Sequence, residues 1–319
     1  MIERDEDGLV YILHYVFQKL LTLCKIWISQ KVKKRQLIVY IAYNMPQVDI
    51  KHLYKVYGEE PEKAFPLMEE GKTREEIRGA TGQVVGVKDA DFTVKDGELF
   101  VIMGLSGSGK STLLRCVNRL VEPTKGDIVI GGTSVPDLNE DELREFRRHN
   151  ISMAFQHFGL LPFRSTYDNV KLPLEIQGEL GEDEIHERVM ESLRMAKLEG
   201  WEDNYPSEMS GGMQQRIGMA RALAPDPDVL LLDECFSELD PLIKRRSQDE
   251  LLEIQERAQK TILFVTHDLA EALKVGDRML ILNKEGAVVQ IADPQEVMDN
   301  PATEYVQRFT EDIRKFMGE

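Results

Sequence analysis

The chain is organised around one glycine-rich segment, Gly104-Leu105-Ser106-Gly107-Ser108-Gly109-Lys110-Ser111-Thr112. Its glycines, lysine and serine have the spacing of a P-loop, a turn that wraps around phosphate groups. Glycine lets successive backbone N–H groups turn toward an anion. A helix that starts near Lys110, with apolar residues at helical spacing as far as Leu120, adds the positive end of its dipole. Lys110 would hold the β- and γ-phosphates, and the Ser111 hydroxyl would ligate Mg²⁺. The whole loop is therefore predicted to bind ATP with Mg²⁺.

Four short runs rich in aliphatic residues predict a parallel sheet that carries this loop. Such runs are typical of strands covered on both faces, and charged periodic segments alternate with them as in an α/β fold. The runs are Phe100 to Met103, Ile151 to Phe155, Val229 to Leu232 and Ile262 to Val265. Just beyond these runs come Gly104, Gln156, Asp233 and, after Thr266, His267. Because ligands bind at the carboxyl ends of parallel strands, we expect these residues at one edge of the sheet.

Asp233 and Glu234 are candidates for the metal ligand and the catalytic base. P-loop enzymes hold the water shell of magnesium with an Asp at the end of an apolar strand. Neighbouring strand residues point in opposite directions, so Asp233 is expected to face the metal and Glu234 a water that attacks the γ-phosphate. Without a P-loop, such a pair is more often the solvated start of a loop. The upstream P-loop favours the functional interpretation.

His267 and Gln156 are weaker signals that depend on the same context. A single histidine at a strand end is more often a hydrogen-bonded structural residue than a catalytic one. At the edge that carries the P-loop, its imidazole could donate a hydrogen bond to a γ-phosphate oxygen. Gln156 is predicted to contact a metal-bound water or the attacking water, which makes it a candidate for both the catalytic and the metal site.

Ser210-Gly211-Gly212-Met213-Gln214 indicates a second anion-binding helix N-terminus. Because the sequence has no second P-loop, this segment suggests sites that are shared between two chains. Upstream of the Asp233-Glu234 strand, it resembles the signature of ABC-transporter ATPases. Ser237-Glu238-Leu239-Asp240 is similar to the D-loop of that family, and Gln156 and His267 are similar to its Q-loop glutamine and switch histidine. The motifs occur in the family's order, and the resemblance spans roughly residues 48–309.

This resemblance implies an α/β fold with a RecA-like P-loop core and an inserted α-helical subdomain. It implies ATP hydrolysis by a homodimer, with Ser210, Gly211, Gly212 and Gln214 covering ATP held by the partner and with Asp240 contributing to that site. It further implies transport through separate integral-membrane permease subunits, with an extracytoplasmic solute-binding protein as an indirect partner. The chain is then expected at the cytoplasmic face of the cell membrane, as a peripheral subunit.

A narrower resemblance is to the glycine betaine/proline, or quaternary amine, importers. The segment Tyr54-Lys55-Val56-Tyr57-Gly58 is followed by an insert from Ala64 to Ile77, the P-loop begins Met103-Gly104-Leu105, and the signature carries Met213 where glutamine is commoner. The resemblance implies that an aromatic residue stacks on adenine. Tyr57 is the preferred candidate, and Phe65 in the insert is the alternative.

The same comparison shows two departures, since Cys235 and Glu238 stand where alanine is usual in the family. Glu238 adds negative charge near the expected dimer contact, so the geometry of that loop stays open. Two alternatives also stay open: an ABC importer ATPase for another solute, such as an amino acid or polyamine, and a soluble ABC ATPase outside transport. Soluble ABC ATPases usually have two ATP sites per chain or a long coiled-coil insertion, and neither is evident in this sequence.

The domain prediction has three parts. Residues 1–44 form an extension outside the folded domain, residues 45–300 the ATPase domain with a helical subdomain at about 141–208, and residues 301–319 a short helical tail. The apolar stretch from Leu9 to Leu23 contains Lys19 and is shorter than the ~20 residues of a membrane span, although an interfacial amphipathic helix is an alternative. Many of the betaine/proline ATPases that this chain resembles continue into a pair of CBS modules, which are linked to sensing of ionic strength. The short tail leaves no room for such a pair, so no C-terminal sensor is expected.

Composition narrows the class of partner. The formal net charge of −16 would repel a phosphate backbone, which argues against nucleic acid as a partner. The three cysteines, Cys24, Cys116 and Cys235, are far apart and form no metal-spaced pair, so neither a disulfide framework nor a zinc site is expected.

Overall fold

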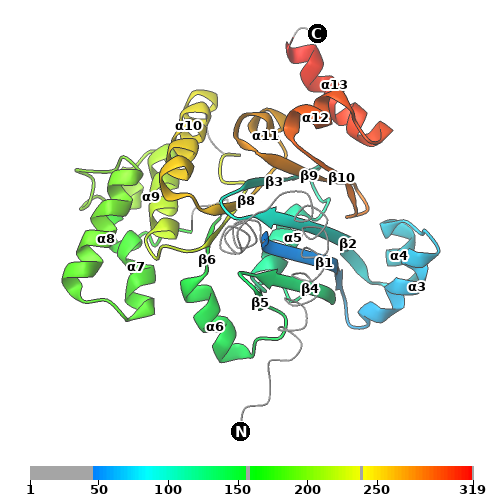
Figure 1. Cartoon of the computed structure of the whole chain (residues 1–319), viewed down its shortest axis with the longest axis horizontal. Helices are drawn as coiled ribbons and strands as arrows, with labels where there is room; N and C mark the ends of the chain where they lie inside the picture. The colour runs from blue at the N-terminus through cyan, green and yellow to red at the C-terminus, as the bar shows by residue number, and fades with distance from the viewer. Residues whose placement is uncertain (1–45, 156–158, 238–239, 318–319) are drawn as a thin grey trace, which may run out of the picture.

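The structure is a computed structural model that describes residues 46–155, 159–237 and 240–317 (Figure 1). The predictions made for Gln156, for Glu238 and for the extension at residues 1–44 lie outside these described residues. Within the described ranges, none of the helices has the length and apolar character that a membrane span requires.

Two sheets form the frame of the molecule. The larger sheet has the strand order β10-β9-β3-β8-β7-β6, and only the β10–β9 pair is antiparallel. The smaller sheet is antiparallel, with the order β2-β1-β4-β5. The strands are β1 (Pro46–Tyr57), β2 (Val84–Lys95), β3 (Leu99–Gly104), β4 (Lys125–Ile130), β5 (Thr133–Ser134), β6 (Ile151–Ala154), β7 (Val229–Asp233), β8 (Thr261–Thr266), β9 (Arg278–Leu282) and β10 (Val288–Ala292).

All four strands predicted from the aliphatic runs are confirmed, as β3, β6, β7 and β8. They are adjacent and parallel in the order β3-β8-β7-β6. Every residue of β3, β7 and β8 is buried, because apolar side chains pack on both faces of these strands. Their carboxyl ends therefore form a rigid edge, and the predicted α/β class is confirmed.

The helices are distributed over both faces of the larger sheet (Figure 1). They are α3 (Ala64–Glu69), α4 (Arg74–Thr81), α5 (Lys110–Val117), α6 (Glu140–His149), α7 (Thr166–Gln177), α8 (Glu182–Met195), α9 (Gly211–Leu223), α10 (Pro241–Ala258), α11 (Leu269–Val275), α12 (Pro294–Asp299) and α13 (Glu304–Met317), with short 3-10 turns η1 (Pro61–Lys63) and η2 (Pro206–Glu208). Helix α5 packs between the two sheets, whereas α9, α10 and α11 contribute to the core on the other face of the larger sheet.

Helix α5 is shorter than the sequence predicts. The apolar periodicity extends to Leu120, but the helix ends at Val117. Asn118 caps it, and Arg119 has a φ of +52°, which turns the chain out of the helix. Leu120 is consequently 50% exposed and not part of the core.

A separate apolar cluster joins α7, α8 and α9, and it includes Leu174, Val189 and Ile217. This cluster lies within and beside the predicted helical subdomain at about 141–208. Helix α6 falls in the same predicted range, but its Leu143 and Phe146 pack with the sheet core. In Figure 1, α7 to α9 lie on the left and the insert helices α3 and α4 on the right. The boundaries proposed for the domains stay predictions.

Candidate nucleotide-binding site

The glycines of the phosphate loop are required by close contacts. Gly104 has a φ of +152°, and a Cβ there would lie 2.5 Å from Ser108 Oγ and 2.6 Å from the carbonyl oxygen of Leu282. Gly109 has a φ of +106°, and a Cβ there would lie 2.1 Å from the carbonyl oxygen of Gly86. Any larger residue would clash at either position. The loop can therefore curve tightly from the end of β3 into α5.

Lys110 is the first residue of α5 and is almost completely buried. Its Nζ lies 3.3 Å from the carbonyl oxygen of Leu105 and 3.3 Å from Oε1 of Glu234. The ammonium group thus lies between the phosphate loop and the residue that follows β7. An anionic phosphate entering the loop would find this charge already in place.

Ser111 and Asp233, the candidate metal ligands, place two oxygen donors next to each other. The Ser111 hydroxyl donates a hydrogen bond of 2.7 Å to Oδ1 of Asp233, and Nη2 of Arg115 lies 2.9 Å from Oδ2 of the same carboxylate. Hard oxygen donors, with water and phosphate oxygens completing the shell, are the ligands that Mg²⁺ prefers. The donor set at Ser111 and Asp233 fits the predicted metal.

Glu234 faces different partners from Asp233. Its φ is +47°, so the backbone turns sharply after β7, and its amide donates to the carbonyl oxygen of Val265 at the end of β8. Oε1 lies 3.3 Å from Lys110 Nζ, as described above, and Oε2 lies 3.3 Å from Nδ1 of His267. The structure therefore brings Lys110, Glu234 and His267 together at the edge predicted from the sequence.

A polar network fixes the segment that carries His267. The amide of Asp268 donates to the Thr266 hydroxyl, which in turn contacts a carboxylate oxygen of Glu271. Lys244 on α10 lies 2.7 Å from both Asp268 and Glu271. Burial tends to raise the pKa of Asp268, but the hydrogen bond and charge of Lys244 outweigh it and hold that pKa below its usual value. Asp268 thus stays charged and caps α11 beside His267.

The signature residues lie away from this phosphate loop. Helix α9 packs on the face of the larger sheet opposite to α5 (Figure 1). Ser210 caps α9 by accepting a hydrogen bond from the amide of Met213. The side-chain amide of Gln214 donates to the carbonyl oxygens of Pro206 and Met209, at 2.8 and 3.1 Å.

Gly212 and Asp240 connect the signature to α10. A Cβ on Gly212 would lie 2.5 Å from Cγ2 of Ile243, so glycine permits a close approach of the two helices. Asp240 caps α10 by accepting a hydrogen bond of 3.0 Å from the amide of Leu242. Gly211 is the first residue of α9. None of these placements tests the predicted contact with a nucleotide, which stays a prediction.

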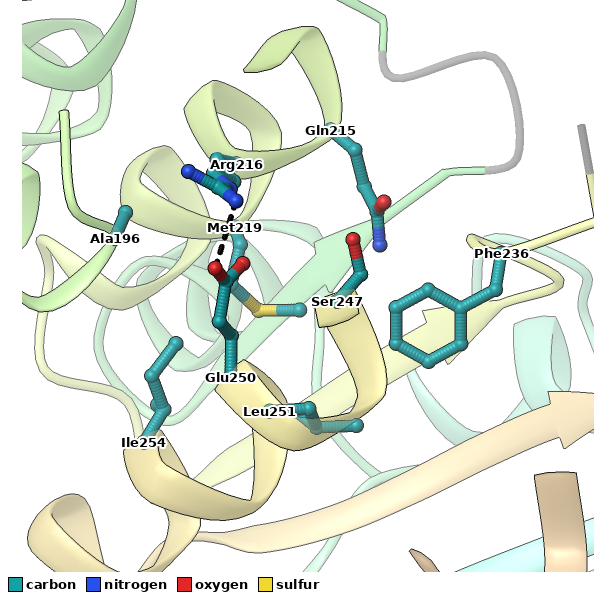
Figure 2. Close-up of a pocket in the computed structure, with 9 residues that line it drawn as sticks. All are labelled: Ala196, Gln215, Arg216, Met219, Phe236, Ser247, Glu250, Leu251 and Ile254. Atoms are coloured by element: carbon teal, nitrogen blue, oxygen red, sulfur yellow. Dashed lines mark hydrogen bonds and ion pairs between the residues drawn. The ribbon is translucent and has the colours of Figure 1, made fainter. Parts of the chain in front are cut away.

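A small cavity lies between α9 and α10 (Figure 2). Its volume of about 20 Å³ has room for one water molecule and is far too small for a nucleotide. Oε1 of Gln215 and Oγ of Ser247 are buried there without a hydrogen-bond partner among the described residues. The ion pair between Arg216 Nη2 and Glu250 Oε1, at 2.7 Å, joins the two helices across the cavity (Figure 2). The cavity belongs to helix packing, not to the phosphate site.

The two aromatic candidates for adenine stacking have different surroundings. Tyr57 is 39% exposed, and its hydroxyl lies 3.2 Å from Oγ1 of Thr112 at the end of the phosphate loop. Phe65 is partly buried and packs edge-on against Tyr54, with ring centroids 5.4 Å apart. Tyr57 is therefore the more exposed of the two rings and the one beside the loop, and Nζ of Lys55 lies over it, 4.8 Å from the ring centroid.

Two arginines at the site were not identified from the sequence. Arg115 lies four residues after Ser111, so both side chains project from one face of α5 toward Asp233, and helical spacing would have indicated this. Arg74, at the start of α4 in the insert, donates to the carbonyl oxygens of Gly107 and Ser108. The capping box formed by Thr73 and Glu76 marks the helix start, but nothing in the sequence indicates this tertiary contact.

Comparison with known proteins gives a consistent result. The sequence profile of the "ABC transporter" family matches residues 87–237. The chain is 52% identical over 267 residues to the glycine betaine transport ATP-binding protein OpuAA of Bacillus subtilis (strain 168), covering 84% of this chain and 63% of that protein. It is 47% identical over 270 residues to the trimethylamine N-oxide transport system ATP-binding protein TmoW of Ruegeria pomeroyi, covering 85% of this chain and 78% of that protein.

A solved structure agrees with both relatives. The dimeric structure of MJ0796, a bacterial ABC transporter cassette, superimposes with a TM-score of 0.65 at 32% sequence identity, covering 77% of this chain and 98% of that chain. The predicted fold class, a P-loop core of the ABC ATPase type, is confirmed by this likeness. This chain spans somewhat less than two thirds of the length of OpuAA, at 63%. The extent and level of identity show that the chain belongs to the ATP-binding proteins of the ABC transporter family.

Proposed function

We propose that this chain binds and hydrolyses ATP to power an importer of osmoprotectants of the glycine betaine/proline type. The observation that carries the enzymatic part is the convergence of Lys110 and His267 on the carboxylate of Glu234, each at 3.3 Å, directly beside the phosphate loop. At a phosphate loop, a lysine ammonium can neutralise phosphate charge and a carboxylate can orient the attacking water. An imidazole there can donate a hydrogen bond to a γ-phosphate oxygen.

Phosphate binding is assigned to the loop from Gly104 to Thr112. Its backbone N–H groups and the Lys110 ammonium would contact the β- and γ-phosphates. Lys110 would then give up its contacts with the carbonyl oxygen of Leu105 and the carboxylate of Glu234 and bind phosphate oxygens in their place. Ser111 and Asp233 would hold Mg²⁺, which when bound neutralises charge on those phosphates. Arg115 would then lose part of its contact with Asp233.

Hydrolysis is assigned to Glu234 and His267. Release of Lys110 leaves Glu234 as an acceptor for a proton of the attacking water. His267 would donate a hydrogen bond to a γ-phosphate oxygen and keep the carboxylate oriented through the 3.3 Å contact. Gln156, outside the described residues, stays the predicted contact for a metal-bound or attacking water. Tyr57 would stack on adenine.

A homodimer would complete the site. Ser210, Gly211, Gly212 and Gln214 begin a helix on the other side of the sheet from this chain's own loop, so within one chain they serve helix capping. A second copy, with its signature facing this loop, would bring a helix N-terminus to the γ-phosphate. Asp240, which starts α10 next to Gly212 and Ile243, would lie at that contact. The relative MJ0796 was solved as a dimer.

An open groove of about 550 Å³ offers a surface for the permease. Arg144, Arg147, Arg148 and Arg221 line it together with the exposed apolar side chains of Phe155 and Ile176. We propose that a cytoplasmic helix of the permease with an apolar face and acidic residues binds there. This contact would hold the chain at the cytoplasmic face of the membrane, and an extracytoplasmic solute-binding protein would act only through the permease.

The proposed substrate rests on the relatives. OpuAA is named for glycine betaine and TmoW for trimethylamine N-oxide, two small solutes with three methyl groups on nitrogen. The chain itself would not contact the solute. An amino acid or polyamine importer is the alternative within the family, and the net charge of −16 argues against a nucleic-acid substrate.

The test is reconstitution of the chain with its permease and solute-binding protein in liposomes that contain ATP. We expect uptake of glycine betaine or proline and none of spermidine, and we expect Lys110→Ala to abolish uptake. Uptake of spermidine alone would overturn the substrate, and uptake unaffected by Lys110→Ala would overturn the assigned ATP site.

A further inference from the structure

The insert helix α4 contacts the back of the phosphate loop through a single side chain. Nη1 of Arg74 donates a hydrogen bond of 2.8 Å to the carbonyl oxygen of Gly107. Nη2 donates to the carbonyl oxygens of Ser108, at 3.1 Å, and of Gly86 on β2, at 2.5 Å. One guanidinium thus joins the insert, the loop and the strand next to Tyr57.

These contacts fix the direction of the peptide groups in the loop. In a trans peptide the C=O and the following N–H point in opposite directions. With the carbonyl of Ser108 held by Arg74, the N–H of Gly109 points away from Arg74. The N–H of Ser108 also points away from Arg74, because it donates a hydrogen bond to the carbonyl oxygen of Leu105. Nζ of Lys110 contacts the same oxygen. Arg74 therefore lies outside the loop, and these N–H groups and Lys110 face the inside.

The surroundings of Arg74 are built to hold it in this position. Its amide donates a hydrogen bond of 2.6 Å to Oε2 of Glu285, in the turn between β9 and β10. A Cβ on Gly286 in the same turn would lie 2.1 Å from Nη2 of Arg74. Nε is buried without a partner among the described residues, so the two terminal nitrogens make the contacts. Burial lowers the pKa of Arg74, and the Glu285 charge opposes this shift.

We propose that Arg74 is a positioning residue for phosphate binding, which holds the carbonyl groups of Gly107 and Ser108 outward so that the N–H groups of Ser108 and Gly109, and not these two carbonyl oxygens, face the nucleotide. Without it, carbonyl oxygens are free to turn toward the phosphates, which they repel. The insert then stabilises the conformation of the phosphate loop through Arg74. This inference rests on the proposed ATP-binding function.

The experiment measures the dissociation constants of ATP, ADP and AMP for the full chain and its variants by isothermal titration calorimetry. AMP serves as a reference ligand because it lacks the β- and γ-phosphates. For Arg74→Gln we expect ATP and ADP to bind about 10- to 100-fold more weakly, the value of one or two charge-assisted hydrogen bonds. AMP binding should change less than about twofold, and Arg74→Lys should recover part of the loss. The KM for ATP should rise more than kcat falls. Arg78→Gln, an exposed residue of the same helix, is the charge-matched control.

A second pair of variants leaves Arg74 in place, in case its replacement prevents folding. Gly286→Ala inserts a methyl group where Nη2 lies, whereas Gly71→Ala has a similar φ, +78° against +74°, and nothing within 4 Å. We expect weaker ATP and ADP binding for Gly286→Ala only. Equal loss for AMP and ATP, or an Arg74→Gln variant that binds ATP within twofold of wild type, would overturn the inference alone. A wild-type chain that binds no ATP would overturn the proposed function and this inference with it.

Discussion

Replacing Glu234 by glutamine isolates the catalytic step from nucleotide binding. The amide has the shape of the carboxylate and retains one oxygen acceptor, but it cannot accept a proton from water. In the structure Glu234 holds Lys110 with Oε1 and His267 with Oε2, both at 3.3 Å, so the substitution leaves a cation and an imidazole beside a neutral group. The phosphate loop and the pair formed by Ser111 and Asp233 remain intact.

The expected magnitude follows from the role of a general base. Loss of such a base typically costs 10²- to 10⁴-fold in rate, which corresponds to about 3–5 kcal/mol in the activation barrier. Affinity should not fall, because Lys110 is released from a competing carboxylate and becomes freer to bind phosphate. We therefore expect kcat to drop by about 10²-fold or more while the Kd for ATP stays within a few-fold of the wild-type value.

Single-turnover hydrolysis of radiolabelled ATP, with ATP binding measured on the same preparation, separates these two quantities. Size-exclusion chromatography with Mg²⁺ and ATP should show the variant accumulating as a dimer. Glu122→Gln, a similar change at an exposed carboxylate that pairs with Arg119, serves as the control. Wild-type turnover by Glu234→Gln at saturating ATP would refute the assignment of the base.

Three further predictions address other parts of the chain. A protein that begins at Met45 should match the full chain in ATPase activity and stability, and a loss of more than about 2 kcal/mol in urea unfolding would show that the extension belongs to the core. Tyr57→Ala should weaken ATP binding by about 2- to 12-fold, the value of one aromatic stack, and should leave the affinity for inorganic triphosphate unchanged. Phe65→Ala should leave the affinity for ATP unchanged, and competition binding measures both variants. Burial, and then the charges of Asp91 and Asp127, raise the pKa of Asp49 from 3.8 to about 6. Because the folded state holds this proton more tightly, its contribution to stability is full below about pH 4 and is lost as the pH rises through 6, so Asp49→Asn should be more stable than wild type at pH 7.5 but not at pH 4 in denaturant titrations.

The sequence was sufficient for the parts of the site that follow from local chemistry. The spacing of glycine, lysine and serine in the phosphate loop fixes its local conformation, because few other residues tolerate the backbone angles of Gly104 and Gly109. The apolar runs predicted β3, β6, β7 and β8, since each is buried on both faces or lies beside such a strand. Parallel pairing then requires Asp233 and His267 to lie at the same edge as the loop.

Contacts between distant segments needed the tertiary structure. Sequence periodicity extended α5 to Leu120, but Arg119 at a φ of +52° ends the helix earlier. Phe65 packs against Tyr54 whereas Tyr57 lies beside Thr112, and spacing carries no information on that packing. Stacking of Tyr57 on adenine stays a prediction.

The phosphate loop, the strands and the edge of the sheet where the polar residues meet could therefore be predicted from local sequence. These depend on the residue types within a few positions and on the rule that parallel strands end together. Two contacts became visible only in the folded chain. Lys110 and His267 converge on Glu234, and Arg74 binds the loop from an insert more than thirty residues earlier in the chain. Such contacts join side chains that are remote in sequence, and their distances are set by how the sheets and helices pack rather than by any local preference.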